Sequence, residues 1–133
     1  AYYKNKKILF QKRAQALVEG LYSIFHGKGY GKLKNINLLT ALADYIIPNM
    51  LREVGIFEYS EKLSTKIDNK IILKKGSPEE IEIRANTIWA IELIRRKLES
   101  KKVKVSALNI NDYLWPIGRD VKTPFHLTRT IPY

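Results

Sequence analysis

Cysteine is absent from this sequence of 133 residues, and histidine occurs only at positions 26 and 126. Without cysteine the chain has no disulfide, no thiolate nucleophile and no cysteine-ligated zinc. Two histidines that lie a hundred residues apart do not form the usual pattern of a metal site. We therefore expect no metal and no redox cofactor, and any chemistry must use oxygen and nitrogen groups alone.

Long uncharged apolar segments are also missing. No stretch approaches the roughly 18 apolar residues that a membrane-spanning helix needs, and the first residues, AYYKNKK, are too polar for a signal peptide. We therefore expect a soluble protein of the cytoplasm that does not associate with membranes. The length fits one domain, residues 1–133, with its own core. The first residue is Ala1 rather than methionine, which indicates processing or a fragment.

Acidic residues are scarce, with 13 Asp and Glu against 24 Lys and Arg, so the formal net charge is +11. The excess lies at the two ends. Residues 1–34 hold eight basic residues and one acidic residue, and residues 101–133 hold six and two, whereas the middle is balanced. A basic surface of this kind attracts phosphate on nucleic acids, nucleotides or lipids. The alternative is a lysine-rich, solvated surface such as thermophilic proteins carry.

Helical periodicity dominates the first half of the chain. Residues 8–25 place apolar side chains on one stripe, which predicts an amphipathic helix that ends at the glycine turn of residues 27–31. Residues 36–47 are apolar nearly all round and predict a buried helix that Pro48 interrupts. A short helix is expected at residues 49–54. The stripe of the first helix consists of Phe10, Ala14, Leu17, Leu21 and Phe25.

The second half also reads as helical. A helix is predicted from residue 59 or 60 to Asp68, followed by a short extended link at residues 70–75. Ser77, Pro78 and Glu80 form the pattern of a capping box, which starts a helix that runs to Ser100. A further helix is predicted at residues 106–119 with a break at Pro116, and an extended tail follows it. The expected fold is an all-α domain with short links.

Asp44 is the strongest candidate for a reactive group. It is the only acidic residue between Glu19 and Glu53, and it lies in the most apolar stretch of the chain, LLTALADYIIPNM. Burial raises the pKa of a carboxyl group and excludes water, which suits a base, a nucleophile or a cation stabiliser. The structural alternative places Asn37, Thr40 and Asp44 on the solvated stripe of a core helix.

Two further groups of charged residues stand out. Arg84 and Glu92 intrude on apolar stripes of the long helix, so they form either a buried ion pair or part of a pocket. His126 and Arg129 lie three residues apart in the tail and offer either an anion-binding pair or an ordinary surface. The glycine turn GKGYG matches neither the Walker pattern nor the dinucleotide-binding fingerprint.

Several of these segments carry a family resemblance. They are FQKRAQALVEGLY, HGKGYGKLKNINLLTALADYIIPNML, GIFEYSEKL, EEIEIRANTIWAIELIRRKL, NDYLW and TPFHLTRTIPY, in this order. Together they resemble the C-terminal half of the queuosine salvage proteins, over about residues 8–133. That family consists of N-glycosylases that release queuine from queuosine 5'-phosphate for salvage into tRNA modification. The resemblance implies a fold related to the helix-hairpin-helix DNA glycosylases.

The resemblance also implies roles for individual residues. Asp44 corresponds to the acidic residue expected to be catalytic and would act on the ribose, where bond cleavage builds positive charge. Ile46 stands where the family usually has a basic residue. The resemblance implies no cofactor. The candidates for contact with the substrate and its phosphate are Lys12, Tyr45, Arg84, His126 and Arg129.

The family resemblance concerns only part of a catalytic unit, since family members carry a substantial N-terminal region. We therefore expect a fragment, a chain whose partner supplies the N-terminal half, or a shortened relative with another function. The leading hypothesis is a nucleotide N-glycosylase whose ligand is queuosine 5'-phosphate or a related nucleotide. The alternative is a non-catalytic, basic helical module that uses its charged ends to bind nucleic acid or a partner chain.

Overall fold

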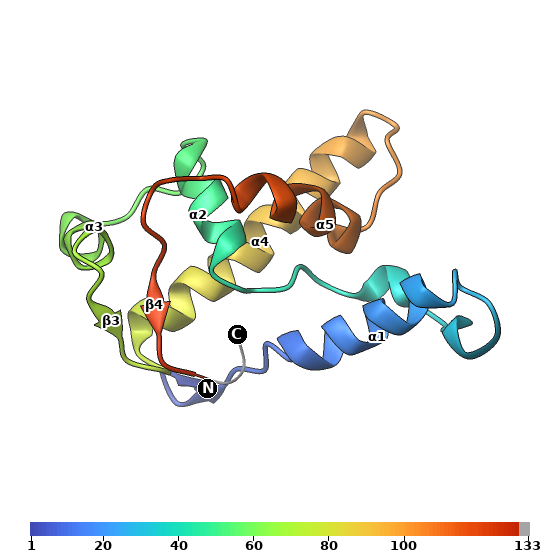
Figure 1. Ribbon diagram of the computed structural model, residues 1–133, viewed down its shortest axis with the longest axis horizontal. Helices are drawn as coiled ribbons and strands as arrows, with labels where there is room; N and C mark the ends of the chain where they lie inside the picture. Colours follow the sequence, from blue (N-terminus) through green and yellow to red (C-terminus); the bar gives the residue numbers. More distant parts are fainter. Residues whose placement is uncertain (131–133) are drawn as a thin grey trace.

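A computed structural model describes residues 1–130, and within them the chain is mostly helical (Figure 1). The α-helices of this part are α1 (Lys12–Ile24), α2 (Ile46–Glu53), α3 (Glu61–Asp68), α4 (Pro78–Ser100) and α5 (Ala107–Gly118). Short 3-10 turns, η1 (Gly29–Gly31) and η2 (Ile36–Leu38), follow α1. None of the helices among residues 1–130 has the length and apolar character needed to cross a bilayer.

Two small sheets complete the described part. Strands β1 (Tyr2–Tyr3) and β2 (Lys6–Lys7) pair antiparallel near the N-terminus. Strands β3 (Ile72–Leu73) and β4 (Leu127–Thr128) pair parallel, which holds the tail beside the link between α3 and α4. The predicted extended link at residues 70–75 is therefore confirmed at Ile72–Leu73, and the predicted extended tail at Leu127–Thr128. Residues 131–133 of that tail lie outside the described residues.

Local capping signals position α3, α4 and α5. Ser60, Ser77 and Ser106 each precede a helix, and each side chain accepts a hydrogen bond from a backbone N–H in the first turn. The capping box predicted at Ser77 is only half formed, because the carboxylate of Glu80 accepts instead from the backbone N–H of Gly76 at 3.0 Å. The other carboxylate oxygen of Glu80 accepts a hydrogen bond from the guanidinium of Arg84.

The helix predicted at residues 36–47 is wrong. The chain makes the single turn η2 and then runs without helical structure until α2 begins at Ile46. Pro48 is the third residue of α2, where a missing backbone N–H costs nothing because first-turn N–H groups have no partner within the helix. Pro48 therefore lies inside the first turn of a helix rather than interrupting one, and Asp44 lies just before it.

The predicted break at Pro116 is also wrong, since α5 continues through this proline to Gly118. The last turn of α5 lies close to α2: a Cβ atom on Gly118 would come within 2.8 Å of the Cγ2 of Ile46. Glycine is therefore required there for the two helices to pack. Ile46, at the position where the family usually has a basic residue, is only 8% exposed, so its side chain belongs to the core.

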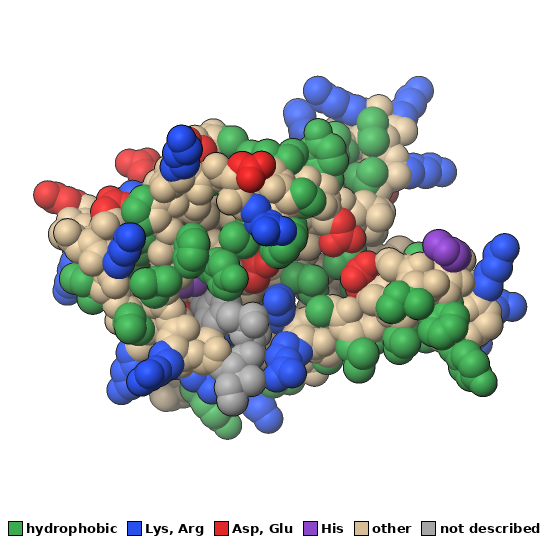
Figure 2. All heavy atoms as spheres, viewed as in Figure 1, with side chains coloured by type: hydrophobic (Ala, Val, Ile, Leu, Met, Phe, Trp, Pro, Cys, Tyr) green, Lys and Arg blue, Asp and Glu red, His purple; other side chains and the backbone are tan. Residues whose placement is uncertain are grey.

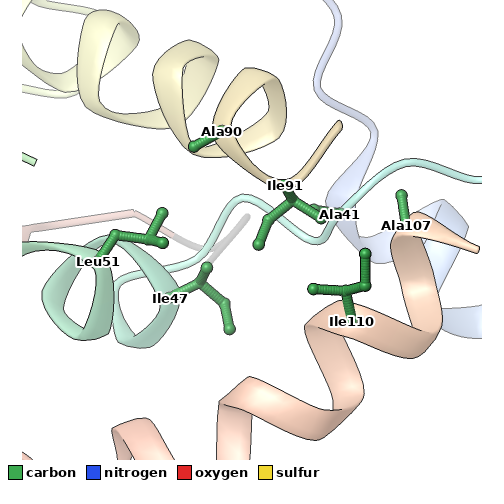
Figure 3. Close-up of a cluster of buried hydrophobic side chains, with 7 residues drawn as sticks. All are labelled: Ala41, Ile47, Leu51, Ala90, Ile91, Ala107 and Ile110. Carbon is green, nitrogen blue, oxygen red and sulfur yellow. The ribbon is translucent and has the colours of Figure 1, made fainter. Parts of the chain in front are cut away.

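The main core lies between α2, α4 and α5. Figure 3 shows side chains from these helices and from the segment before α2 pointing towards one another. Ile47 and Ile91 have no exposed surface at all, and full burial of such a side chain stabilises the fold by roughly 1.5–3 kcal/mol. The cluster consists of Ala41, Ile47, Leu51, Ala90, Ile91, Ala107 and Ile110.

Helix α1 lies apart from this core, along the lower edge of the molecule in Figure 1. Its helical character is confirmed, although it begins at Lys12 rather than at residue 8. None of its residues is buried. Of the predicted apolar stripe, only Phe10, which precedes the helix, is buried, in a small cluster with Ala43 and Ile81. The stripe residues within α1 and at its end face outward.

Candidate active site

The segment before α2 is held in place by side chains of three different helices. Gln15 of α1 accepts a hydrogen bond from the backbone N–H of Thr40 at 2.8 Å. Asn111 of α5 accepts from the N–H of Leu42 at 3.0 Å. The guanidinium of Arg84, on α4, donates to the carbonyl of Ala43 at 3.2 Å. These bonds replace the backbone ladder that a helix or strand would supply, and they fix the position of the next residue, Asp44.

Asp44 accepts three hydrogen bonds. Its Oδ1 atom accepts from the backbone N–H groups of Ile46 and Ile47, at 2.9 and 3.1 Å, and so caps the N-terminus of α2. Its Oδ2 atom accepts from the indole N–H of Trp115, on α5, at 2.9 Å. The residue is only 5% exposed, so the solvated stripe considered as an alternative is wrong for Asp44.

Two opposing effects act on the pKa of Asp44. Burial raises this pKa above the usual carboxyl range, because a charged group loses its hydration. The N–H groups of Ile47 and Ile46, the charge of Lys12 and the hydrogen bond from Trp115 lower it, and the net direction is upward. The helix N-terminus also favours negative charge at this point. The result is a poorly hydrated carboxyl group that three hydrogen bonds hold in place.

Asp44 borders a cavity of about 360 Å³, which lies at the small end of the range for ligand pockets. The cavity combines one basic, two acidic and three other side chains: Lys12, Leu42, Asp44, Asn111, Asp112 and Trp115. Asp112 was missed by the sequence argument. Desolvation at the cavity wall raises the pKa of its carboxyl group, and the charge of Glu19 adds to this effect. The pattern NDYLW contained both Asp112 and Trp115, but nothing in it pointed to Asp44.

A larger groove of about 870 Å³ lies next to this cavity, between α1 and η2 on one side and α4 and α5 on the other. Asp112 lines both spaces. The groove wall carries charges of both signs, among them Glu19, Glu92, Arg95 and Lys104. The small cavity therefore lies beside a larger concave surface.

Two of the predicted binding residues, Lys12 and Tyr45, lie beside Asp44, one across the cavity wall and one along the chain. Lys12 is the first residue of α1 and lines the cavity. Tyr45 directly follows Asp44, and its ring stacks on that of Phe125 with 4.7 Å between the ring centroids. Tyr45 is 38% exposed. The structure thus places one cation and one accessible aromatic ring near the carboxylate.

Arg84 belongs to a buried ion pair, as one of the two sequence alternatives predicted, but its partner is Glu80 rather than Glu92. The two charged groups are 3.1 Å apart, and both side chains are less than a tenth exposed. The guanidinium of Arg84 also lies 4.0 Å from the ring centroid of Phe10. Glu92 instead forms ion pairs with two arginines on the surface of α4.

His126 is buried beside this pair, whereas Arg129 is exposed. Burial lowers the pKa of His126 to about 4; the negative charge of Glu80 opposes this shift, and the positive charge of Arg84 adds to it. The imidazole is therefore neutral at neutral pH and supplies no positive charge. The structure thus separates the candidates into two groups. Lys12 and Asp44 line the cavity, whereas Arg84 and His126 are buried near Glu80.

No group of three or more His, Asp or Glu side chains within residues 1–130 is arranged to hold a metal ion.

Comparison with known proteins identifies the family of this chain. The sequence pattern that defines the queuosine salvage proteins matches residues 1–133, which is the whole chain. The chain belongs to the queuosine salvage protein family. Within this family, it is 40% identical to queuosine 5'-phosphate N-glycosylase/hydrolases of Sphaerobacter thermophilus and Dictyostelium discoideum, and 37% identical to that of Mus musculus.

Each of these alignments includes the whole chain but only 42 or 43% of the relative. The chain therefore spans less than half the length of the queuosine salvage proteins that it matches. It includes Asp44 together with α1, α4 and α5, whose side chains bond to the segment before this residue.

Proposed function

We propose that this chain carries the reactive carboxylate of a queuosine 5'-phosphate N-glycosylase/hydrolase, and that this carboxylate is Asp44. Family membership and the activity named for the relatives support the reaction type. The observation that carries the assignment to Asp44 is its geometry. It is a buried carboxylate at a cavity wall, fixed by three hydrogen bonds, in a segment secured from three helices.

The chemistry explains why such a carboxylate is needed. Cleavage of the N-glycosidic bond leaves positive charge on the ribose, and a nearby carboxylate stabilises that charge, attacks C1' or activates water. Queuine is a 7-deazaguanine, so carbon replaces the ring nitrogen that purine glycosylases often protonate. Catalysis must therefore act more strongly on the sugar, and Asp44 must be ionised to do so.

The remaining candidates take different roles in this proposal. Lys12 shares the cavity with Asp44 and is the best-placed partner for the 5'-phosphate, with the exposed Arg129 as a second cation. Tyr45 offers its partly exposed ring to the sugar or base. Arg84 holds the carbonyl of Ala43 and thus positions Asp44, and His126 packs beside it.

The relation to helix-hairpin-helix DNA glycosylases is also part of this proposal. The mostly helical fold is compatible with it.

The test measures release of free queuine from queuosine 5'-phosphate. The chain is incubated with the substrate, alone and together with the part of the Sphaerobacter thermophilus relative that it does not match. We expect release that the Asp44→Asn substitution lowers by at least about 100-fold, because the neutral amide cannot stabilise the ribose cation. The amide oxygen can still accept the two backbone hydrogen bonds that cap α2, although the indole N–H of Trp115 loses its acceptor, so thermal unfolding of the variant checks that the fold is retained.

The matched control is Asp120→Asn, which changes an exposed aspartate just after α5 and should leave the rate unchanged. Because Asp44 must lose its proton, the rate should fall as the pH drops through a pKa above the ordinary carboxyl range. Full queuine release by Asp44→Asn would disprove the role of Asp44. Absence of release by both mixtures, together with tight, salt-sensitive binding of nucleic acid, would favour the basic binding module instead.

A further inference from the structure

The outward face of α1 is an apolar surface that nothing in the described chain covers. Leu17, Leu21 and Ile24 lie four and three residues apart, so they share one side of the helix. Their exposed fractions are 65, 36 and 73%. An amphipathic helix gains most of its stability from burying its apolar side. In α1 that side faces solvent, while the other side carries Gln15 and lines the groove.

The apolar surface continues past the end of the helix. Phe25 follows Ile24 and meets the ring of Tyr30 edge-on, with 5.9 Å between the ring centroids. Gly31 permits this turn, because a Cβ atom there would lie 2.6 Å from that of Phe25. We call Leu17, Leu21, Ile24, Phe25 and Tyr30 the α1 patch. Figure 2 shows hydrophobic side chains along α1 and towards the turn that follows it.

The charges around the α1 patch narrow the choice of occupant. Exposed basic residues lie near the patch in the sequence, namely Arg13, Lys28, Lys32 and Lys34. A second copy of the chain would bring a net charge of +11 against another +11, which opposes self-association. A nucleic acid would meet the lysines but would leave the exposed Leu, Ile and Phe side chains uncovered. The surface best fits a polypeptide with an apolar centre and an acidic border.

The relatives are more than twice as long as the part that matches this chain, so most of each family unit lies outside that part. We propose that this remaining part of the family unit packs on the α1 patch through apolar side chains bordered by Asp and Glu. The proposal rests on family membership and on the exposed surface, and it does not depend on the catalytic role of Asp44.

The test is complex formation in solution. The chain is co-expressed with the part of the Sphaerobacter thermophilus relative that it does not match, and the purified mixture is examined by light scattering and calorimetry. We expect a one-to-one complex. Leu17→Glu and Ile24→Glu should each weaken binding by about 30-fold or more, because each buries a charge at the centre of an apolar interface. Both positions are exposed, so the variants should unfold at the same temperature as the unmodified chain.

Leu93→Glu is the matched control, since it makes the same change at a half-exposed position of α4, outside the patch. It should change the affinity by less than about threefold. Hydrogen exchange should show new protection of the α1 amides in the complex. No complex with the unmodified chain, or equal losses for Leu93→Glu and Leu17→Glu, would overturn the proposal. The proposal would also be overturned if Leu17→Glu left binding of the polypeptide intact but abolished a dimer of the chain. The same holds if it abolished binding to phosphatidylserine vesicles instead.

Discussion

Helix α1 and the body formed by α2, α4 and α5 both have amphipathic sequences, but only the body buries its apolar side. Ile47 and Ile91 of the body are fully buried, whereas α1 has no buried residue. The same periodicity therefore produces a core in one region and an exposed surface in the other. Periodicity determines which side chains share a face, but coverage of that face depends on what else is present to pack against it.

The largest difference between the two regions should appear when a buried charge loses its partner. Arg84→Met should lower the free energy of unfolding by about 3–5 kcal/mol, because the carboxylate of Glu80 stays buried without its guanidinium. Arg13→Met makes the same change at an exposed position of α1 and should cost less than about 0.5 kcal/mol. Urea titrations of both variants measure these changes in the free energy of unfolding. Equal losses would show that α1 is as strongly coupled to the core as α4.

Truncation of apolar side chains gives the next largest contrast. Ile91→Ala should destabilise the fold by about 2–5 kcal/mol, since it leaves a cavity among α2, α4 and α5. Leu17→Ala removes a similar side chain that is mostly solvated, so its cost should stay within about 0.5 kcal/mol. Thermal and urea unfolding of both variants provide the comparison. A large loss for Leu17→Ala would mean that the α1 patch is covered in solution.

The two histidines extend the comparison to pH, because one lies in each region. Burial lowers the pKa of His126 to about 4, whereas an unfolded chain binds the proton near 6.5. The folded state thus resists protonation, and the stability present above pH 6.5 is lost as the pH falls towards 4. The loss approaches about 3 kcal/mol over this range. Urea unfolding between pH 7 and 4 measures it.

Substitutions of each histidine separate this effect from the titration of carboxylates. His126→Gln should flatten the pH dependence of stability between pH 6.5 and 4, because glutamine has no proton to gain. His26→Gln, at the exposed end of α1, should leave that dependence unchanged. If both variants keep the pH dependence of the unmodified chain, the pKa of His126 in the folded state is close to its unfolded value. The side chain would then not be buried in solution.

Much of the fold could be predicted because its signals are local. Ser60 and Ser77 marked the starts of α3 and α4 through capping bonds within the first turn. The error at residues 36–47 has a physical cause, since a short apolar run looks the same whether it is helical or buried in extended form. The aspartate at position 44, four residues before Pro48, was itself the available signal, because aspartate caps helices and proline is tolerated in the first turn.

Of the candidate site, the sequence could predict Asp44 but not the residues that hold it in place. Asp44 stood out as a lone acidic residue in an apolar segment, but its partner Trp115 is 71 residues away in the sequence. Asn111 is 69 residues from Leu42, which it anchors. No local pattern encodes such pairings, because they depend on how α5 packs on α2. The role predicted for Arg84 changed for the same reason: its hydrogen bond to Ala43 spans 41 residues.

The bond between Gln15 and Thr40 has a consequence for how the molecule could respond to a partner. It joins the inner side of α1 to the segment that ends in Asp44, while the α1 patch occupies the outer side of the same helix. A partner that changes the position or mobility of α1 would act on this segment through that bond. If binding at the α1 patch strengthens ligand binding at the Asp44 cavity by some factor, thermodynamic reciprocity requires that the ligand strengthen binding at the patch by the same factor. Binding of a partner at the α1 patch and binding of a ligand at the Asp44 cavity would then each favour the other.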